Sequence, residues 1–130
     1  MKKYSLTLSS YIPSNTKIDV YELCKNGKSL FEDFFNKIEK EGNLLSNLAG
    51  AIRIIEDTAN LKLRPKNQFR LIQGHSLNCK VYEAKSGGIR IYLFHEEKTG
   101  RIIVSGGNKD SQGEDIKQML KIIKVYQNEK

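Results

Sequence analysis

The stretch KVYEAKSGGIRIYLFHEEKTGRIIVSGG, residues 80–107, decides the fold. It contains three runs rich in β-branched and aromatic residues, and turn-forming residues at 86–88 and 96–100 separate these runs. Runs of this kind, divided by short turns, predict a meander of antiparallel strands. Residues 89–94 alternate between two sides with the period of a strand, so we predict a half-buried central strand. One face of that strand would carry Arg90, Tyr92 and Phe94.

The first half of the chain predicts two more strands and two helices. Residues 3–9 and 18–23 alternate with the period of a strand, and whether these two strands pair is left open. Ser29 followed by Glu32 has the spacing of a capping box, which marks a helix start. Apolar residues at helical spacing then predict two amphipathic helices over residues 29–59, joined by a turn at Gly42-Asn43. Residues 69–73 predict the strand that opens the sheet.

The end of the chain repeats the pattern of a helix start. Ser111 and Glu114 have the spacing of a second capping box. The apolar stripe that follows consists of Ile116, Met119, Leu120, Ile123 and Tyr126. The prediction is an α+β fold in one domain of 130 residues, with two helices from the N-terminal half and one C-terminal helix on a twisted, mostly antiparallel sheet. The role of residues 10–28 stays open.

The charge of the chain is placed unevenly. The formal net charge is +7, and residues 62–130 hold fourteen Lys or Arg against seven Asp or Glu, whereas residues 1–61 hold eight of each. Such a surplus is explained either by a solvated basic surface or by an anionic partner, nucleic acid or an acidic protein. Two cysteines far apart and two histidines predict neither a zinc site nor a disulfide. No signal peptide or membrane span is expected, which predicts a cytoplasmic protein.

The second half resembles the RelE/HigB superfamily of toxins from type II toxin-antitoxin modules. The resemblance rests on a YE-containing strand at 81–84, a G-I-R-I-Y strand at 88–92, and G-G-x-K-x-x-Q at 106–112 before a terminal helix. It covers roughly residues 30–126. It implies a RelE-like fold, a metal-independent mRNA endoribonuclease (mRNA interferase) without a cofactor that acts on translated messages in the ribosome, and a cognate antitoxin protein as partner.

Metal-free RNA cleavage, in which the ribose 2′-hydroxyl attacks the adjacent phosphate, needs cations, a proton acceptor and a proton donor. The resemblance implies that Arg90 contacts the phosphate, that Lys109 contacts phosphate or donates a proton, and that Lys85 is the basic residue before the turn. His95 is either a general base or an ordinary polar strand end. The nuclease hypothesis depends on an Arg90 side chain that projects into an open electropositive hollow.

RNA-binding residues are predicted on the same surface. The run from residue 62 to 80 is basic and contains no acidic residue, which is typical of an RNA-binding groove or of a solvated connector. The candidates are Arg64, Lys66, Arg70, Lys80, Tyr92, Gln112 and Tyr126. For Tyr92 and Tyr126 the pattern favours core packing over RNA binding, and Glu83 is interpreted as the partner of a neighbouring cation.

The chain departs from the family in having Gly-Gly-Asn-Lys where better-studied members have a Lys-Lys pair. Two alternatives therefore stay open: a ParE-like gyrase inhibitor, or a binding-only protein whose basic groove receives an acidic antitoxin segment.

Overall fold

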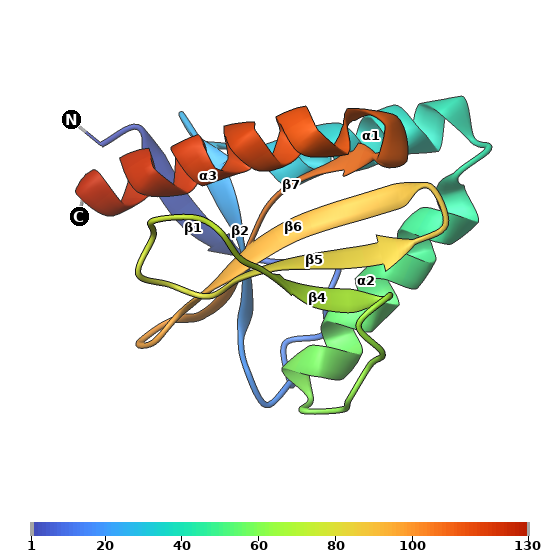
Figure 1. The fold of residues 1–130 in the computed structure, drawn as a ribbon, viewed down its shortest axis with the longest axis horizontal. Helices are drawn as coiled ribbons and strands as arrows, with labels where there is room; N and C mark the ends of the chain where they lie inside the picture. The colour runs from blue at the N-terminus through green and yellow to red at the C-terminus, as the bar shows by residue number, and fades with distance from the viewer. Residues whose placement is uncertain (1, 130) are drawn as a thin grey trace.

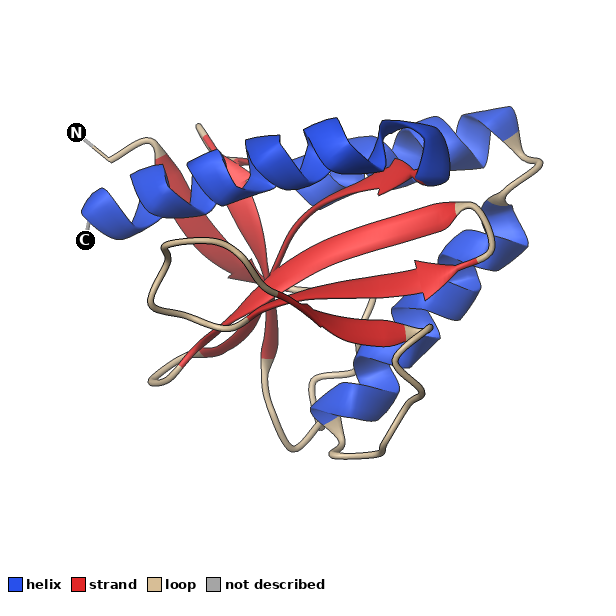
Figure 2. Cartoon of the chain, viewed as in Figure 1, coloured by secondary structure: helices blue, strands red, loops and turns tan. Residues whose placement is uncertain are grey.

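The computed structural model describes residues 2–129 and contains three α-helices and a seven-stranded sheet (Figures 1 and 2). The strands are β1 (Tyr4–Leu8), β2 (Val20–Lys25), β3 (Lys28–Ser29), β4 (Phe69–Ile72), β5 (Val81–Ser86), β6 (Ile89–Glu96) and β7 (Gly100–Asn108). The α-helices are α1 (Leu30–Glu41), α2 (Leu45–Ala59) and α3 (Gln112–Asn128), and a short 3₁₀ turn, Lys109–Ser111, precedes α3.

The sheet is mixed and mostly antiparallel. Its order is β1-β2-β7-β6-β5-β4, with β3 paired to β2. The predicted meander is confirmed, because β5, β6 and β7 are consecutive antiparallel neighbours. The α+β class, with two helices from the first half and one at the C-terminal end, is confirmed as well.

Residues 10–28 supply an interior strand, next to the edge strand β1. The predicted strand over residues 18–23 corresponds to β2, which pairs with β1 in antiparallel register and with β7 in parallel register. Asn26 and Gly27 follow with φ values of 53° and 84°. Two successive residues with left-handed backbone form a two-residue hairpin turn, a type in which Asn-Gly is preferred. The chain then returns as β3.

Helices cover both faces of the sheet, as Figure 1 shows for α3 on one side and α2 on the other. Ile89, Ile91 and Leu93 of β6 belong to one apolar cluster with residues of α1 and α2, whereas Tyr92 and Phe94 belong to a second cluster with α3. The prediction of a half-buried β6 is therefore wrong: Ile89 through Phe94 are all buried. β6 carries apolar side chains on both of its faces, as expected for a strand in a sheet that is covered on both sides.

The two predicted capping boxes have different outcomes. The Ser29 hydroxyl accepts a hydrogen bond from the Glu32 backbone amide at 3.0 Å, so the first helix start is confirmed. The second capping box is wrong, because Ser111 makes no cap bond and its hydroxyl donates to Asp115 at 2.6 Å. Asn108 caps the preceding 3₁₀ turn instead, and an asparagine side chain bonds to the backbone of such turns readily.

Candidate nucleic-acid interface

The structure brings three of the four predicted catalytic residues to one end of the sheet. Lys85 and Arg90 are opposite each other in the β5–β6 register, and the Lys109 backbone amide donates to the Gly88 carbonyl at 3.0 Å. His95 lies five residues further along β6, about 17 Å away at the usual strand rise. The four predicted catalytic residues therefore do not form one site.

Arg90 does not project into an open hollow, and this expectation is wrong. Its side chain is only 6% exposed and lies on the face of the sheet that α3 covers. The guanidinium Nη1 donates to the Gly87 carbonyl at 2.7 Å and to the Ile89 carbonyl at 3.2 Å, while Nε finds no partner among residues 2–129. Arg90 is thus folded back onto the β5–β6 turn, which it holds in place.

A buried polar cluster continues from Arg90 along the same face. The Glu83 carboxylate is 1% exposed and accepts hydrogen bonds from Arg70 Nε at 2.8 Å and from Gln112 Nε2 at 2.6 Å. These bonds join β4, β5 and α3. Arg70 and Gln112 were both predicted to bind RNA, and each donates a hydrogen bond to this buried carboxylate. Glu83 is therefore the cation partner that the sequence suggested.

Tyr92 is excluded from base stacking, because its side chain is completely buried. Its hydroxyl makes no hydrogen bond of good geometry among the described residues. Burial, and then the nearby Glu83 and Asp115 carboxylates, raise the pKa of Tyr92, and Arg90 opposes this shift. The prediction of an RNA-binding Tyr92 is wrong, because α3 covers the face on which the ring lies.

The raised pKa of Tyr92 predicts a loss of stability in alkali. The folded state holds the phenolic proton more tightly than the unfolded chain does, so stability falls as pH rises above the ordinary value of 10.0. A Tyr92→Phe variant should match the parent chain near pH 7 within about 1 kcal/mol and lose less stability above pH 10. Urea unfolding on both sides of pH 10 measures this difference. An equal alkaline loss in both proteins would contradict it.

A second group of predicted residues lies at the opposite end of the sheet. Tyr126 is buried, with its ring 5.9 Å from that of Phe94 and its hydroxyl donating to Glu96 at 3.1 Å. Burial and Glu96 raise the pKa of Tyr126. The position of Tyr126 therefore does not support the predicted RNA-binding role. The structure instead has the alternative, in which Tyr126 packs in the core. Lys80 and His95 line a separate hollow of about 750 Å³ beside Cys79.

The surface most suited to an anion lies between α2 and the β5–β6 turn. It is a hollow of about 440 Å³, to which Arg53, Arg64 and Lys85 contribute three cations. Asn67 and Gln68 add amide groups, and no carboxylate from residues 2–129 lines it. We call it the cationic hollow. It contains two predicted residues, Arg64 and Lys85, and one that the sequence analysis missed, Arg53.

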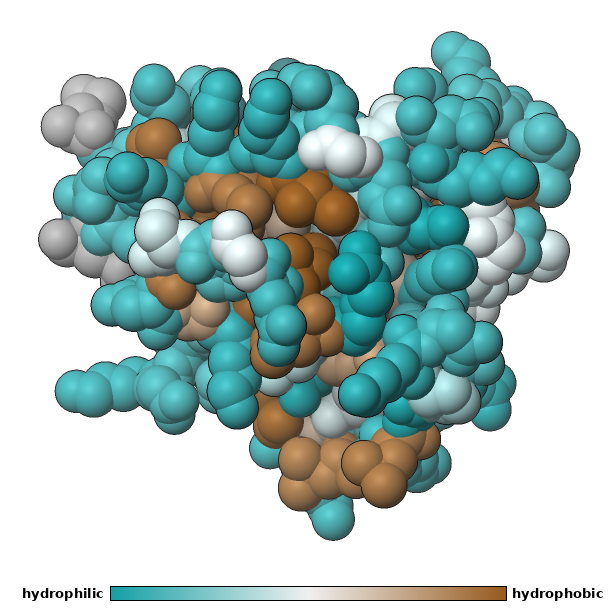
Figure 3. Space-filling view, viewed as in Figure 1, coloured by the Kyte–Doolittle hydropathy of each residue, from teal (hydrophilic) through white to brown (hydrophobic). Residues whose placement is uncertain are grey.

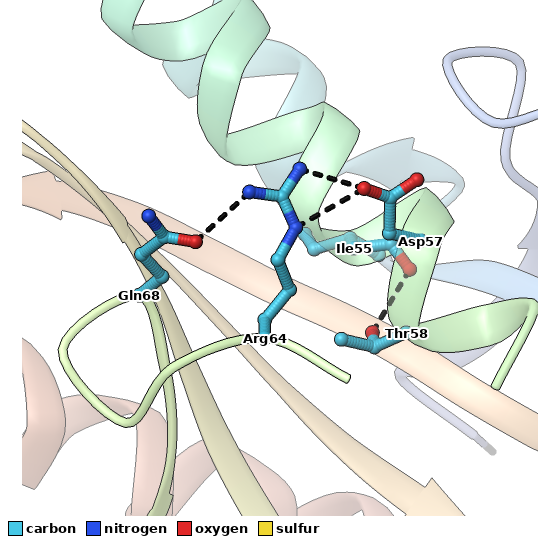
Figure 4. Close-up of polar contacts among 5 residues, drawn as sticks. All are labelled: Ile55, Asp57, Thr58, Arg64 and Gln68. Carbon is cyan, nitrogen blue, oxygen red and sulfur yellow. Dashed lines mark hydrogen bonds and ion pairs between the residues drawn. The ribbon is translucent and has the colours of Figure 1, made fainter. Parts of the chain in front are cut away.

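The Arg64 side chain lines the cationic hollow and is held by hydrogen bonds, which Figure 4 shows. Its Nε and Nη2 donate to one oxygen of Asp57 at 3.1 and 2.6 Å, and its Nη1 donates to Gln68 at 2.9 Å. By contrast, neither Arg53 nor Lys85 forms an ion pair within the described residues. The hollow therefore has one immobilised guanidinium and two cations that remain available to an anionic ligand.

Comparisons of the chain with protein-family models, with curated proteins and with solved structures each give no match. In the part of the chain that the structure describes, no three His, Cys, Asp or Glu side chains are grouped to hold a metal ion. Nor does any helix between residues 2 and 129 have the length and apolar character needed to span a membrane. Cys24 and Cys79 are free thiols, as the sequence predicted.

Proposed function

We propose that this protein binds RNA at the cationic hollow, as a cytoplasmic RelE-like toxin of a type II toxin-antitoxin module, held inactive by a cognate antitoxin. One observation carries the proposal: Arg53, Arg64 and Lys85 converge on a hollow in whose lining the described residues place no carboxylate. A concave surface of this kind attracts phosphate groups without reading bases. Lys109, exposed beside the β5–β6 turn, extends the positive surface.

As a metal-independent endoribonuclease, the protein would act on mRNA under translation. The ribose 2′-hydroxyl loses its proton to a base as its oxygen forms a bond to phosphorus, and the bond to the 5′-oxygen breaks. A proton passes to that leaving oxygen, so the products are a 2′,3′-cyclic phosphate and a 5′-hydroxyl. Lys85 and Lys109 are the predicted catalytic residues at this end of the sheet that solvent reaches, so they would stabilise the negative charge. Arg90 becomes a positioning residue, because its hydrogen bonds hold the turn that follows Lys85.

Binding without cleavage is the second candidate, and the burial of Arg90 favours it. A guanidinium that donates to two carbonyls inside the protein has fewer donors left for a phosphate. In this candidate the cationic hollow receives RNA, or the chain acts as a ParE-like gyrase inhibitor. Expression of the chain alone separates these cases, because cut transcripts indicate the nuclease and DNA damage with intact transcripts indicates gyrase inhibition.

The cationic hollow predicts a salt-dependent affinity for single-stranded RNA. Each phosphate contact that is lost should reduce the slope of log affinity against log salt by about 0.7, so an Arg53→Gln, Lys85→Gln double variant should lose about 1.4 and bind at least about tenfold more weakly. Filter binding over a range of salt concentrations measures both quantities. The matched control is Lys121→Gln, Lys124→Gln, which removes the same charge from the exposed face of α3.

Equal weakening by both double variants would mean that only net charge matters, and it would contradict a site at the cationic hollow. The same reactions report cleavage, since the reaction leaves 5′-hydroxyl ends on the products. Loss of those ends in Lys85→Gln and Lys109→Gln single variants that still bind RNA supports the nuclease. Binding by the parent chain without new ends supports the second candidate.

A further inference from the structure

The loop from α2 to β4, residues 60–68, presents two leucines to solvent. Leu63 is 98% exposed and Leu61 is 63% exposed, the two highest values among the large apolar side chains of the described residues. In Figure 3 a hydrophobic patch lies at the bottom of the molecule, over this loop. An exposed leucine by itself is ordinary, but two that are nearly bare and close in sequence form a surface that needs an explanation.

This loop is tied to α2 on both sides of Leu63. The Leu61 amide donates to the Thr58 carbonyl at 3.0 Å, and the Lys62 amide donates to the Asp57 carbonyl at 2.9 Å. The Arg64 side chain is bound to Asp57 on α2, as Figure 4 shows. In this arrangement, with the loop held by backbone hydrogen bonds and an ion pair, both leucine side chains face solvent.

The backbone at Leu61 is unfavourable for leucine. Its φ of 64° is left-handed, a region that asparagine and glycine enter more easily than other residues. The two hydrogen bonds that end α2, from the Leu61 and Lys62 amides to the Thr58 and Asp57 carbonyls, form a Schellman motif, and this motif offsets the strain. Capping of α2 therefore explains the backbone at Leu61, but this position usually holds glycine or asparagine, so the exposed leucine side chain still needs an explanation.

Positive charge surrounds these two leucines. Lys62 and Lys66 are exposed in the same loop, and no acidic residue occurs between positions 62 and 82. The one nearby carboxylate that the structure pairs with this loop, Asp57, is occupied by Arg64. RNA could use the lysines but not the leucines, and a second copy of this chain would place lysines against lysines. The complement of this surface is an apolar segment flanked by carboxylates.

We infer that Leu61 and Leu63, with Lys62 and Lys66, form a docking site for an acidic segment of a partner protein that inserts leucine-like side chains between the lysines. The inference does not rest on RNA binding. It concerns two leucines that are not among the residues that line the cationic hollow. Apolar contact would provide affinity, and the lysines would provide steering and selectivity against basic segments.

The test uses a fluorescein-labelled peptide in which leucines recur three and four residues apart and glutamates fill the other positions. Fluorescence anisotropy compares the parent chain with a Leu61→Asn, Leu63→Asn double variant. Asparagine accepts the left-handed backbone, so this variant should fold at least as well as the parent while its affinity for the peptide falls at least about tenfold. The matched control is Leu8→Asn, which changes another exposed leucine on β1, at the opposite edge of the sheet.

A peptide with lysine in place of glutamate, and one with serine in place of leucine, should both bind at least about tenfold more weakly than the acidic peptide. No binding of the acidic peptide, or equal binding to the parent and the double variant, overturns the inference. So does a preference of the parent chain for vesicles of equal parts phosphatidylserine and phosphatidylcholine, which would assign the leucines to a membrane surface. Self-association that the double variant abolishes would assign them to a second copy. The Arg53→Gln, Lys85→Gln variant should bind the peptide normally, so failure here and failure of RNA binding are distinguishable.

Discussion

The Arg90→Ala variant is expected to be less stable than the parent chain by about 3 kcal/mol, which for a chain of this size lowers the melting temperature by roughly 10 °C. Two causes add. The Gly87 and Ile89 carbonyls lose the donor that lies 2.7 and 3.2 Å away, and a buried acceptor such as the Ile89 carbonyl left without this bond costs about 1–3 kcal/mol. In addition, the buried side chain leaves a void on the face that α3 covers. Thermal and urea unfolding measure the change.

Lys109→Ala is the matched control, because Lys109 is exposed near the same turn. Its stability should stay within about 0.5 kcal/mol of the parent value. An Arg90→Ala chain that unfolds like the parent would contradict the structural role of the guanidinium. If that stable variant also lost RNA cleavage, Arg90 would instead contact the phosphate, as the family resemblance implies. Activity of Arg90 variants therefore has to be normalised to the folded fraction.

The burial of Arg90 marks the limit of what alternation along a strand can predict. Alternation placed Arg90, Tyr92 and Phe94 together on one face, and the structure has them there. Whether that face is open depends on where a helix twenty residues later in the chain packs. The apolar stripe of α3 has to be buried somewhere, and Tyr92 and Phe94 offered an apolar surface for it. Arg90 is a charged residue between apolar neighbours, and its charge wrongly indicated that this face is open to solvent.

Local signals predicted the elements well, because each depends on neighbours in sequence. The Ser29 cap, the turn at Gly42 and the turn between β5 and β6 are all set by residues within a few positions of one another. The parallel pairing of β2 with β7 has no such signal, since it joins Val20 to Arg101. Long-range pairing of this kind is decided by which buried surfaces fit together, and one sequence does not show that.

Arg53 was missed for a related reason. On α2 it is one exposed cation outside the apolar stripe, and nothing in its sequence neighbourhood distinguishes it from a solvated residue. It becomes part of the cationic hollow only because α2 packs closely on the β5–β6 turn. Gly50 and Gly87 make that approach possible, since a methyl group on either would overlap Ser86 or Asn47. The hollow is therefore a product of helix packing and not of a motif.

The Gly-Gly of the G-G-x-K-x-x-Q pattern has a packing explanation that does not involve catalysis. Gly106 and Gly107 are adjacent in β7, so their missing side chains would point to opposite faces of the sheet. A Cβ on Gly106 would overlap the ring of Phe34 on α1, and a Cβ on Gly107 would overlap the carboxylate of Asp115 on α3. The two glycines thus let a helix approach β7 on each side. Packing alone therefore explains why this pattern contains two successive glycines.

Gly106→Ala should therefore cost more stability than Gly107→Ala, although the two changes add the same methyl group. The ring of Phe34 can yield only if α1 moves with it, and overpacking of this kind costs about 1–3 kcal/mol. The end of Asp115 can swing away, so Gly107→Ala loses at most the hydrogen bond from Ser111, about 1 kcal/mol, which the reduced freedom of the unfolded chain partly offsets. Urea unfolding of the two variants compares these costs directly. A Gly107→Ala variant that is the less stable of the pair would show that Asp115 is held more rigidly than Phe34, and that α3 rather than α1 limits the packing on β7.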